Sequence, residues 1–188
     1  MKQNLEAFSF CELEIGSGNG KFLVEHAMQR PDVFFLGIEY SRKCINKSVA
    51  KASKRGLANI LFIHGEAMRS ITQYLAGKYR FSAVYLNFPD PWPKTKHERR
   101  RIVTALFVGA VYGILARNGS FYLVTDDMRY AEEIMSPVME ASPHFENALS
   151  SPWVHELPGY QPTLYEEKMR KAGKQVYYLQ YRRRGLDF

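Results

Sequence analysis

The sequence lacks the features that define several large classes of protein. Its only two cysteines, Cys11 and Cys44, have no CxxC or Cys/His spacing around them, so neither a disulfide framework nor a metal site is indicated. We expect both thiols to be buried. No apolar run approaches the roughly 20 residues that cross a bilayer, and Met1–Glu6 lacks the apolar core of a secretory signal. The sequence therefore predicts a cytoplasmic protein with neither a metal nor a membrane partner.

Length and composition predict a single domain. The chain has 188 residues, of which 46% are hydrophobic, enough to bury one continuous core. We expect one domain over residues 1–188, with residues 1–9 disordered and residues 182–188 forming a basic tail. The sequence leaves a monomer and a homodimer equally open.

Positive charge is concentrated in two segments. The net charge is +7, yet residues 94–101 alone carry a net +4 and residues 168–184 a net +7, which leaves −4 for the rest of the chain. An acidic body with two basic segments predicts that one face meets a polyanion. The end of the second segment, Arg182 to Arg184, can equally be a solvated terminus.

Strand and helix patterns alternate along the chain. The expected strands cover residues 10–15, 33–39, 59–63, 81–88, 119–125 and 175–181, and the expected helices cover residues 21–29, 42–55, 68–75, 97–115 and 127–141, the last interrupted at Pro137. Apolar strands that alternate with helices predict an α/β fold with a mostly parallel sheet covered on both faces.

A glycine loop joins the first expected strand to the first expected helix, with glycines at positions 16, 18 and 20. The dinucleotide fingerprint G-x-G-x-x-G, counted from Gly16, requires a glycine at position 21, where this chain has Lys21. Glu14 ends the strand before the loop. Its carboxylate disfavours a pyrophosphate but can bind the ammonium of a methionine moiety. The loop therefore favours S-adenosylmethionine, with an NAD-dependent oxidoreductase as a weaker alternative.

Two more acids stand at strand ends, because Glu39 ends the second strand and Glu66 follows the third. The carboxyl ends of parallel strands meet at one edge of a sheet, so we expect Glu14, Glu39 and Glu66 to converge on one pocket. Glu39 is placed to accept from ribose hydroxyls and Glu66 from the adenine amino group. Any one of these acids alone can equally be a solvated loop residue or a helix cap. Together they favour a nucleoside cofactor.

The most distinctive segment is YLNFPDPWPK, residues 85–94. Prolines at alternate positions fix φ and prevent both helix and sheet pairing around Asp90 and Trp92. Such a rigid loop suits a catalytic site, although it can also simply cap the sheet. The cationic residues 94–101 follow at the start of the expected helix 97–115, where cations oppose the helix dipole, so their position favours bound phosphates.

Residues 85–101, YLNFPDPWPKTKHERRR, closely resemble the signature of the TrmB-type tRNA (guanine-N7)-methyltransferases. EIGSGNG (residues 14–20), Thr125-Asp126 and PTLYEEK (residues 162–168) match the same family, so the resemblance spans about residues 12–183. It implies a class I methyltransferase fold, which is Rossmann-like and doubly wound, with a mostly parallel seven-stranded sheet. It also implies S-adenosylmethionine as cofactor, tRNA as partner, and N7-methylguanosine in the tRNA variable loop as product.

The same resemblance assigns roles to individual residues. The residues expected to bind the cofactor are Glu14, Gly16, Gly18, Glu39, Glu66 and Asp90, of which Asp90 is also the catalytic residue. Those expected to bind tRNA are Lys94, Asp126, Thr163, Leu164, Tyr165 and Glu166. Nearby glycine and proline predict that Thr163 to Glu166 form a loop that becomes ordered on substrate. Relatives more often have Asp or Asn in place of Glu66, and many begin with a longer basic extension.

The chemistry of guanine limits what Asp90 has to do. N7 carries a lone pair and no proton, so its attack on a sulfonium methyl needs no general base. We therefore expect Asp90 to accept from the N1/N2 edge and to balance the positive charge, while Asp126 and Glu166 hold a flipped base. Trp92 can equally stack on a base or pack internally. A methyltransferase for another RNA base or an amino group, and an inactive RNA-binding relative, stay open as alternatives.

Overall fold

The computed structural model describes residue 8 and residues 10–185, except for the side chains of Thr95 and Ile134. The strands are β1 (Phe10–Ile15), β2 (Val33–Glu39), β3 (Ile60–His64), β4 (Phe81–Asn87), β5 (Leu115–Thr125), β6 (Phe145–Asn147) and β7 (Tyr177–Arg183). The α-helices are α2 (Lys21–Gln29), α3 (Arg42–Lys54), α4 (Ala67–Ser70), α5 (Ala105–Ile114), α6 (Met128–Tyr130), α7 (Ser136–Glu140) and α8 (Leu164–Lys171). Shorter helical turns are the π-helices η1 (Ile71–Leu75) and η3 (Ala131–Met135) and the 3₁₀ helix η2 (Thr95–Arg100).

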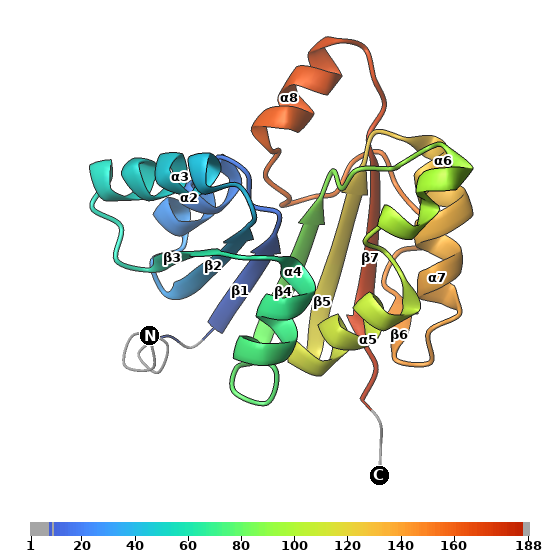
Figure 1. The fold of residues 1–188 in the computed structure, drawn as a ribbon, viewed down its shortest axis with the longest axis horizontal. Helices are drawn as coiled ribbons and strands as arrows, with labels where there is room; N and C mark the ends of the chain where they lie inside the picture. The colour runs from blue at the N-terminus through green and yellow to red at the C-terminus, as the bar shows by residue number, and fades with distance from the viewer. Residues whose placement is uncertain (1–7, 9, 186–188) are drawn as a thin grey trace.

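All seven strands form one sheet in the order β3-β2-β1-β4-β5-β7-β6. The pairs from β3 to β5 are parallel, and β7 runs antiparallel to both β5 and β6 (Figure 1). This arrangement confirms the expected doubly wound, mostly parallel sheet. After β3 the chain crosses back to place β4 on the other side of β1, so the winding direction changes between β1 and β4. In such sheets the crevice at this switch point is where ligands bind.

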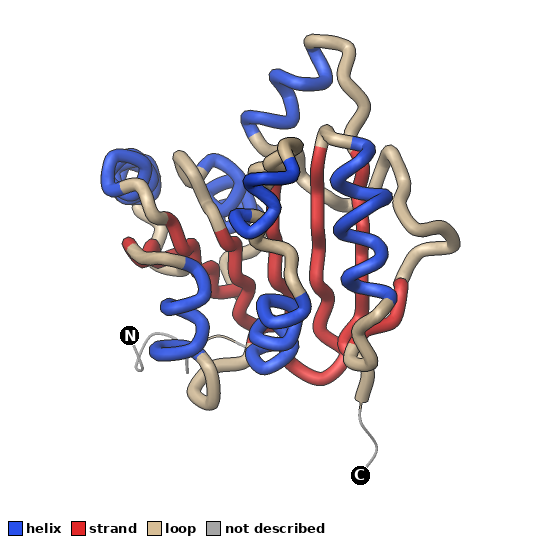
Figure 2. The backbone as a smooth tube through the Cα atoms, turned by 45° about the vertical axis from the view of Figure 1, so that its right-hand side comes forward, coloured by secondary structure: helices blue, strands red, loops and turns tan. Residues whose placement is uncertain are grey.

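The alternation of β1 separates the two faces of the sheet. Leu13 and Ile15 are buried in a large apolar cluster with residues from η1, α5 and α7, whereas Glu12 and Glu14 belong to the face that α2 covers. Phe22 of α2 packs on that face beside Tyr85 of β4. Each fully buried large apolar side chain contributes about 2 kcal/mol, so these clusters hold the carboxyl ends of the strands in fixed positions. Figure 2 shows α8 standing beyond these strand ends, apart from the helices that cover the sheet.

The expected helix over residues 97–115 is wrong in its first half. The basic segment forms η2, the chain is then extended, and α5 begins only at Ala105. Branched side chains at 102–104 disfavour a continuous helix, and Thr104 caps α5 by accepting from the backbone N–H of Phe107. Leu115 already belongs to β5. The cationic residues therefore do not oppose the dipole of a long α-helix.

Residues 127–141 are helical, but the irregularity lies before Pro137 rather than at it. The π-helix η3 precedes α7, and Pro137 occupies the first turn of α7. Proline has no N–H to donate, so the wider turn before it accommodates the missing bond.

No helix in the described part of the chain is both long and apolar enough to cross a membrane.

Two local expectations are wrong, those of buried thiols and of a basic tail, and one strand was missed. Cys11 and Cys44 are free thiols that are only half-buried. The short strand β6 was missed because three residues carry too little pattern to be recognised. Arg182 and Arg183 lie within β7 rather than in a tail, and Arg183 packs its guanidinium 4.3 Å from the ring centre of Tyr112. Except for residue 8, the expectation for residues 1–9 falls outside the described residues.

Two glycines allow a direct test of how closely the sheet is packed beneath the switch point. A Cβ on Gly37 of β2 would lie 2.6 Å from Phe62 and 2.8 Å from Ser17, whereas one on the exposed Gly109 of α5 would meet nothing within 4 Å. We expect Gly37→Ala to lose about 2 kcal/mol of unfolding free energy through overpacking. Gly109→Ala should gain up to about 1 kcal/mol, because alanine is the better helix former. Urea unfolding of both variants measures this, and a Gly37→Ala variant as stable as wild type contradicts it.

Candidate active site

Two adjacent cavities open at the switch point between β1 and β4. The first, which we call the glycine-loop cavity, has a volume of about 420 Å³ and is lined by Glu14, Gly16, Ser17, Gly18, Asn19, Lys21, Phe22, Asn87, Phe88, Thr163, Leu164, Tyr165 and Lys168. The second, the proline-loop cavity, has a volume of about 350 Å³ and is lined by Ile15, Gly16, Ile38, Glu39, Tyr40, Gly65, Ala67, Leu86, Asn87, Phe88, Pro89, Asp90, Trp92, Arg100 and Ile102. They share Gly16, Asn87 and Phe88, so one elongated ligand can occupy both.

The glycine loop takes a backbone path that other residues rarely follow. Gly16 and Gly18 have φ of 77° and 52°, and a Cβ on either would point into open space rather than into protein. The constraint there is conformational. Gly20, with φ of 70°, is also sterically required, because its Cβ would lie 2.7 Å from Ser48 of α3. The loop thus exposes backbone to the cavities while α2 and α3 hold its far side.

Glu14 is buried at the inner end of the glycine-loop cavity. Its Oε1 accepts from Asn87 Nδ2 at 2.9 Å, and its Oε2 is buried without a hydrogen-bond partner. Burial raises the pKa of Glu14 to about 8, the hydrogen bond from Asn87 opposes this rise, and nearby Glu39 adds to it. A buried carboxylate oxygen without a partner is costly in the free protein. A cationic group from a ligand would remove that cost.

Glu39 and Glu66 have different surroundings. The Glu39 carboxylate lines the proline-loop cavity and accepts from the backbone N–H of Gly18 at 2.8 Å and of Ser41 at 2.7 Å. Glu66 instead caps α4, accepting from Met68 and Arg69 at 2.9 and 2.7 Å, and its neighbours at 65 and 67 form the cavity wall. The structure therefore brings Glu14 and Glu39 to the ligand crevice and places Glu66 at its border as a helix cap.

The proline loop, residues 88–93, presents Asp90 in a strained backbone. Phe88 and Trp92, on either side of it, have φ of 49° and 43°, values that large side chains rarely adopt. Arg101 holds the loop by donating to the carbonyl oxygens of Pro91 and Trp92 at 3.0 and 3.1 Å, and the guanidinium of Arg100 lies 4.8 Å from the Trp92 ring centre. Asp90 is exposed in the proline-loop cavity. The strain is thus concentrated around the carboxylate expected to act in catalysis.

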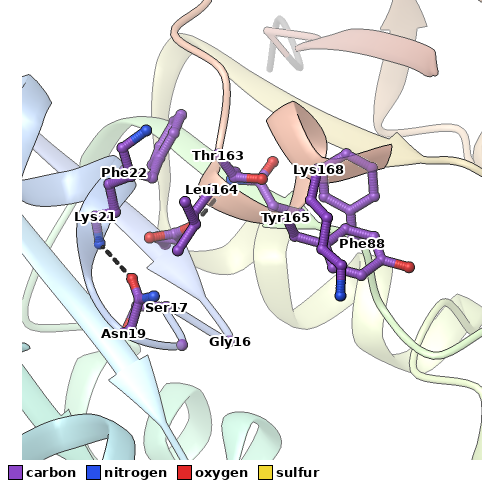
Figure 3. A pocket seen from close by; sticks show the side chains of 13 residues that line it. Gly16, Ser17, Asn19, Lys21, Phe22, Phe88, Thr163, Leu164, Tyr165 and Lys168 are labelled. Atoms are coloured by element: carbon purple, nitrogen blue, oxygen red, sulfur yellow. Dashed lines mark hydrogen bonds between the residues drawn. The ribbon is translucent and has the colours of Figure 1, made fainter. Parts of the chain in front are cut away.

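Three of the six residues expected to contact the substrate gather on the opposite wall of the glycine-loop cavity. Thr163, Leu164 and Tyr165 line it beside Phe88, whose ring centre is 4.9 Å from that of Tyr165 (Figure 3). Asp126 lies next to this wall, 3.5 Å from the Tyr165 hydroxyl. Lys94 lines neither cavity and is exposed at the start of η2.

The expectation of a loop at residues 163–166 is wrong, because Thr163 is the N-cap of α8 and accepts from the N–H of Glu166 at 3.0 Å. The pattern Thr-x-x-Glu is a helix-start signal that the nearby glycine and prolines obscured. The Glu166 side chain is buried, bonded to the Tyr178 hydroxyl and to Arg170 at 3.0 Å. Glu166 therefore anchors α8 and does not line either cavity.

Further contacts fix α8 over the crevice. Lys21, the first residue of α2, pairs with Glu167 at 2.6 Å, and Lys174 pairs with Asp126 at 2.7 Å. The described residues contain no cluster of acids, histidines or cysteines that could hold a metal ion. Of the residues that line the glycine-loop cavity, sequence reasoning missed seven: Ser17, Asn19, Lys21, Phe22, Asn87, Phe88 and Lys168. Five of them had a signal: Asn87 and Phe88 stand in the distinctive segment 85–94, and Ser17, Asn19 and Lys168 stand in the segments 14–20 and 162–168 that match the family.

Taken together, the geometry suits a ligand with a cationic end and a nucleoside end. The buried oxygen of Glu14 has no partner among the described residues, so a cationic group of a ligand can pair with it. Glu39 stands at the end of β2, where a carboxylate can accept from ribose hydroxyls. Tyr165 is exposed beside the half-buried Phe88, so this wall can accept a planar base.

The chain matches known methyltransferases along almost its whole length. A family model described as a putative methyltransferase matches residues 9–179. The tRNA (guanine-N(7)-)-methyltransferase of Chromohalobacter salexigens is 36% identical, with the match covering 97% of this chain and 76% of the relative. The enzyme of the same name from Alkalilimnicola ehrlichii is 37% identical over 92% of this chain and 72% of its own length.

Solved structures share the fold at lower identity. The 16S rRNA methyltransferase KamB superposes with a TM-score of 0.74 at 16% identity, over 98% of this chain and 92% of that chain. TrmN from Thermus thermophilus superposes with a TM-score of 0.66 at 16% identity, over 97% of this chain and 46% of the other. These likenesses concern the fold alone.

The raised pKa of Glu14 has a measurable effect on stability. The folded chain holds a proton up to about pH 8, whereas the unfolded carboxyl loses it near 4.5, so the contribution of Glu14 to stability falls as pH rises through this window. Glu14→Gln keeps the shape but cannot ionise. We expect this variant to be more stable than wild type by over about 1 kcal/mol at pH 8 and by less at pH 5. Urea unfolding at both pH values measures the difference, and an equal difference at both would contradict the assignment.

Proposed function

Because the chain belongs to the family of tRNA (guanine-N(7)-)-methyltransferases, we propose that it transfers the methyl group of S-adenosylmethionine to N7 of a guanine in tRNA. The single observation that carries the proposal is that two adjoining cavities are lined by the buried Glu14 in one and by Asp90 in the other. We further propose that the target guanine lies in the variable loop. A tRNA substrate also supports the expected cytoplasmic location.

We propose that the cofactor lies across both cavities. Glu14 would bind its ammonium, Gly16 and Gly18 would approach it through their backbone, and Glu39 would hold its ribose. When bound, S-adenosylmethionine supplies a methyl group made electrophilic by the adjacent sulfonium. Glu66 would act at the adenine end mainly by capping α4, which shapes the border of the cavity.

The base would enter from the side of α8. Phe88 and Tyr165 offer ring faces for stacking, and Asp126 and Asp90 offer carboxylates at either side. N7 has no proton to lose, so the residues need only align the base and balance the charge that develops on it. In this arrangement Glu166 supports the wall from behind, because its carboxylate is bonded to Arg170 and Tyr178.

The reaction is tested by incubating the protein with labelled S-adenosylmethionine and unmodified tRNA and identifying the labelled nucleoside. We expect N7-methylguanosine. Asp90→Ala should lower the rate at saturating cofactor on the order of 100-fold, since a charge aimed at the transition state is lost. Asp32→Ala, an exposed acid before β2 at the other end of the sheet, is the matched control and should keep the wild-type rate.

Each other outcome of this experiment points elsewhere. A different labelled nucleoside would assign the protein to another base or to an amino group. Bound RNA without any label would make it an inactive RNA-binding relative. Near-normal turnover by Asp90→Ala would remove Asp90 from the mechanism.

Lys94 is expected to contact a tRNA phosphate without taking part in the chemistry. It is exposed at the start of η2, close to the proline loop. We expect Lys94→Ala to weaken tRNA binding a few-fold and to lower the slope of log affinity against log salt by about one. Fluorescence anisotropy over a range of salt concentrations measures both. Lys78→Ala, which removes an exposed lysine before β4 at the opposite end of the sheet, should leave the slope unchanged.

A further inference from the structure

We infer that Asn87 and Tyr160 are positioning residues for the cofactor: together they orient Glu14 so that one carboxylate oxygen stays available to the ammonium group. This inference rests on the proposed function, because it takes S-adenosylmethionine or its product as the ligand of the glycine-loop cavity. Neither residue was expected from the sequence to have a role in the site.

The first step of the chain of contacts lies between β4 and β1. Asn87, the last residue of β4, donates through Nδ2 to Oε1 of Glu14 at 2.9 Å. The other oxygen, Oε2, is buried and has no partner within the described structure. Asn87 and Glu14 both line the glycine-loop cavity. The amide thus holds one oxygen and leaves the second for a ligand.

The second step fixes which way the amide of Asn87 points. An asparagine side chain has a donor end and an acceptor end, and the reverse orientation would set its oxygen against the carboxylate of Glu14. Tyr160 prevents this, because its hydroxyl donates to Oδ1 of Asn87. Burial raises the pKa of Tyr160 well above its ordinary value, so the phenol stays a donor at neutral pH. The nitrogen of the amide is therefore left facing Glu14.

The third step fixes the phenol itself. The ring of Tyr160 is surrounded by four aromatic rings, each from a different element, those of Phe22, Tyr85, Tyr122 and Tyr178, at centroid distances of 5.5, 6.1, 6.0 and 5.2 Å. Tyr160 also lies three residues before Thr163, where α8 begins. Thr163, Leu164 and Tyr165 form the cavity wall that we call the substrate wall. One side chain thus connects the segment that leads to the substrate wall with the carboxylate that would hold the cofactor.

These contacts affect the proton equilibrium of Glu14, which must be ionised to bind an ammonium. Asn87 lowers its pKa, against the larger effect of burial and the repulsion from Glu39. The other charged groups facing the cavity are Lys21 of α2 and Lys168 of α8. Removing the amide, or freeing it to turn, should raise the pKa of Glu14 further. The pH above which the cofactor binds fully should then rise.

The test is calorimetric titration with S-adenosylhomocysteine, which carries the same ammonium, at several pH values between about 6.5 and 9.5. Loss of one hydrogen bond corresponds to about 1 kcal/mol, so we expect Tyr160→Phe to bind about 5-fold more weakly at neutral pH and Asn87→Ala more weakly still. In both variants the midpoint of the pH dependence should move upward. Tyr122→Phe is the matched control: it lies in the same aromatic cluster, its hydroxyl does not contact Asn87, and it should bind as wild type does.

Two results would overturn the inference. One is wild-type affinity and midpoint in both variants, and the other is weaker binding with an unmoved midpoint, which would mean that the residues act only through packing. Because Tyr160→Phe keeps the ring in its cluster, it carries the test even if Asn87→Ala fails to fold. Failure of the wild-type protein to bind S-adenosylhomocysteine would instead overturn the proposed function, and is seen before any variant is compared.

Discussion

The carboxyl group of Glu14 is almost fully buried, and burying an ionised carboxylate is unfavourable. The rest of the site depends on how this unfavourable free energy is offset. Burial disfavours its charge, while the one hydrogen bond from Asn87 favours it, and the balance leaves its pKa raised to about 8. When it is ionised, such a buried carboxylate lowers the stability of the ligand-free protein. A cation that binds to it restores that stability. Sites that store such a cost are common where function requires a strong response to one ligand.

Charge on α8 is neutralised by contacts that also define the shape of the crevice. Glu167 pairs with Lys21 of α2, and Glu166 is bonded to Arg170 and Tyr178 in the interior. A helix of eight residues has little stability by itself, so these tertiary contacts and the cap at Thr163 hold it over the strand ends. The substrate wall is therefore as fixed as its anchors are.

The proline loop is held by restrictions on its backbone, whereas α8 is held by contacts of its side chains. Its two strained aromatic residues, Phe88 and Trp92, are held because prolines restrict the chain between them and Arg101 binds two of its carbonyl groups. Asp90 is thus presented by the backbone geometry of this loop. This suits a reaction in which the nucleophile has no proton to lose and the carboxylate needs only to be in the right place.

The sequence by itself determined the alternation of strands and helices, the glycine loop, and the positions of three acids. These acids are Glu14 and Glu39 at strand ends and Asp90 in the proline loop. Each of these features depends on residues only a few positions away along the chain. The tertiary structure alone decided the rest. The extended break after η2 depends on Arg101 reaching back to the proline loop, and the burial of Glu166 depends on Tyr178 of β7. The link from Tyr160 to Asn87 joins residues 73 positions apart. No local pattern records such contacts, since their energy comes from groups that meet only when the sheet is assembled.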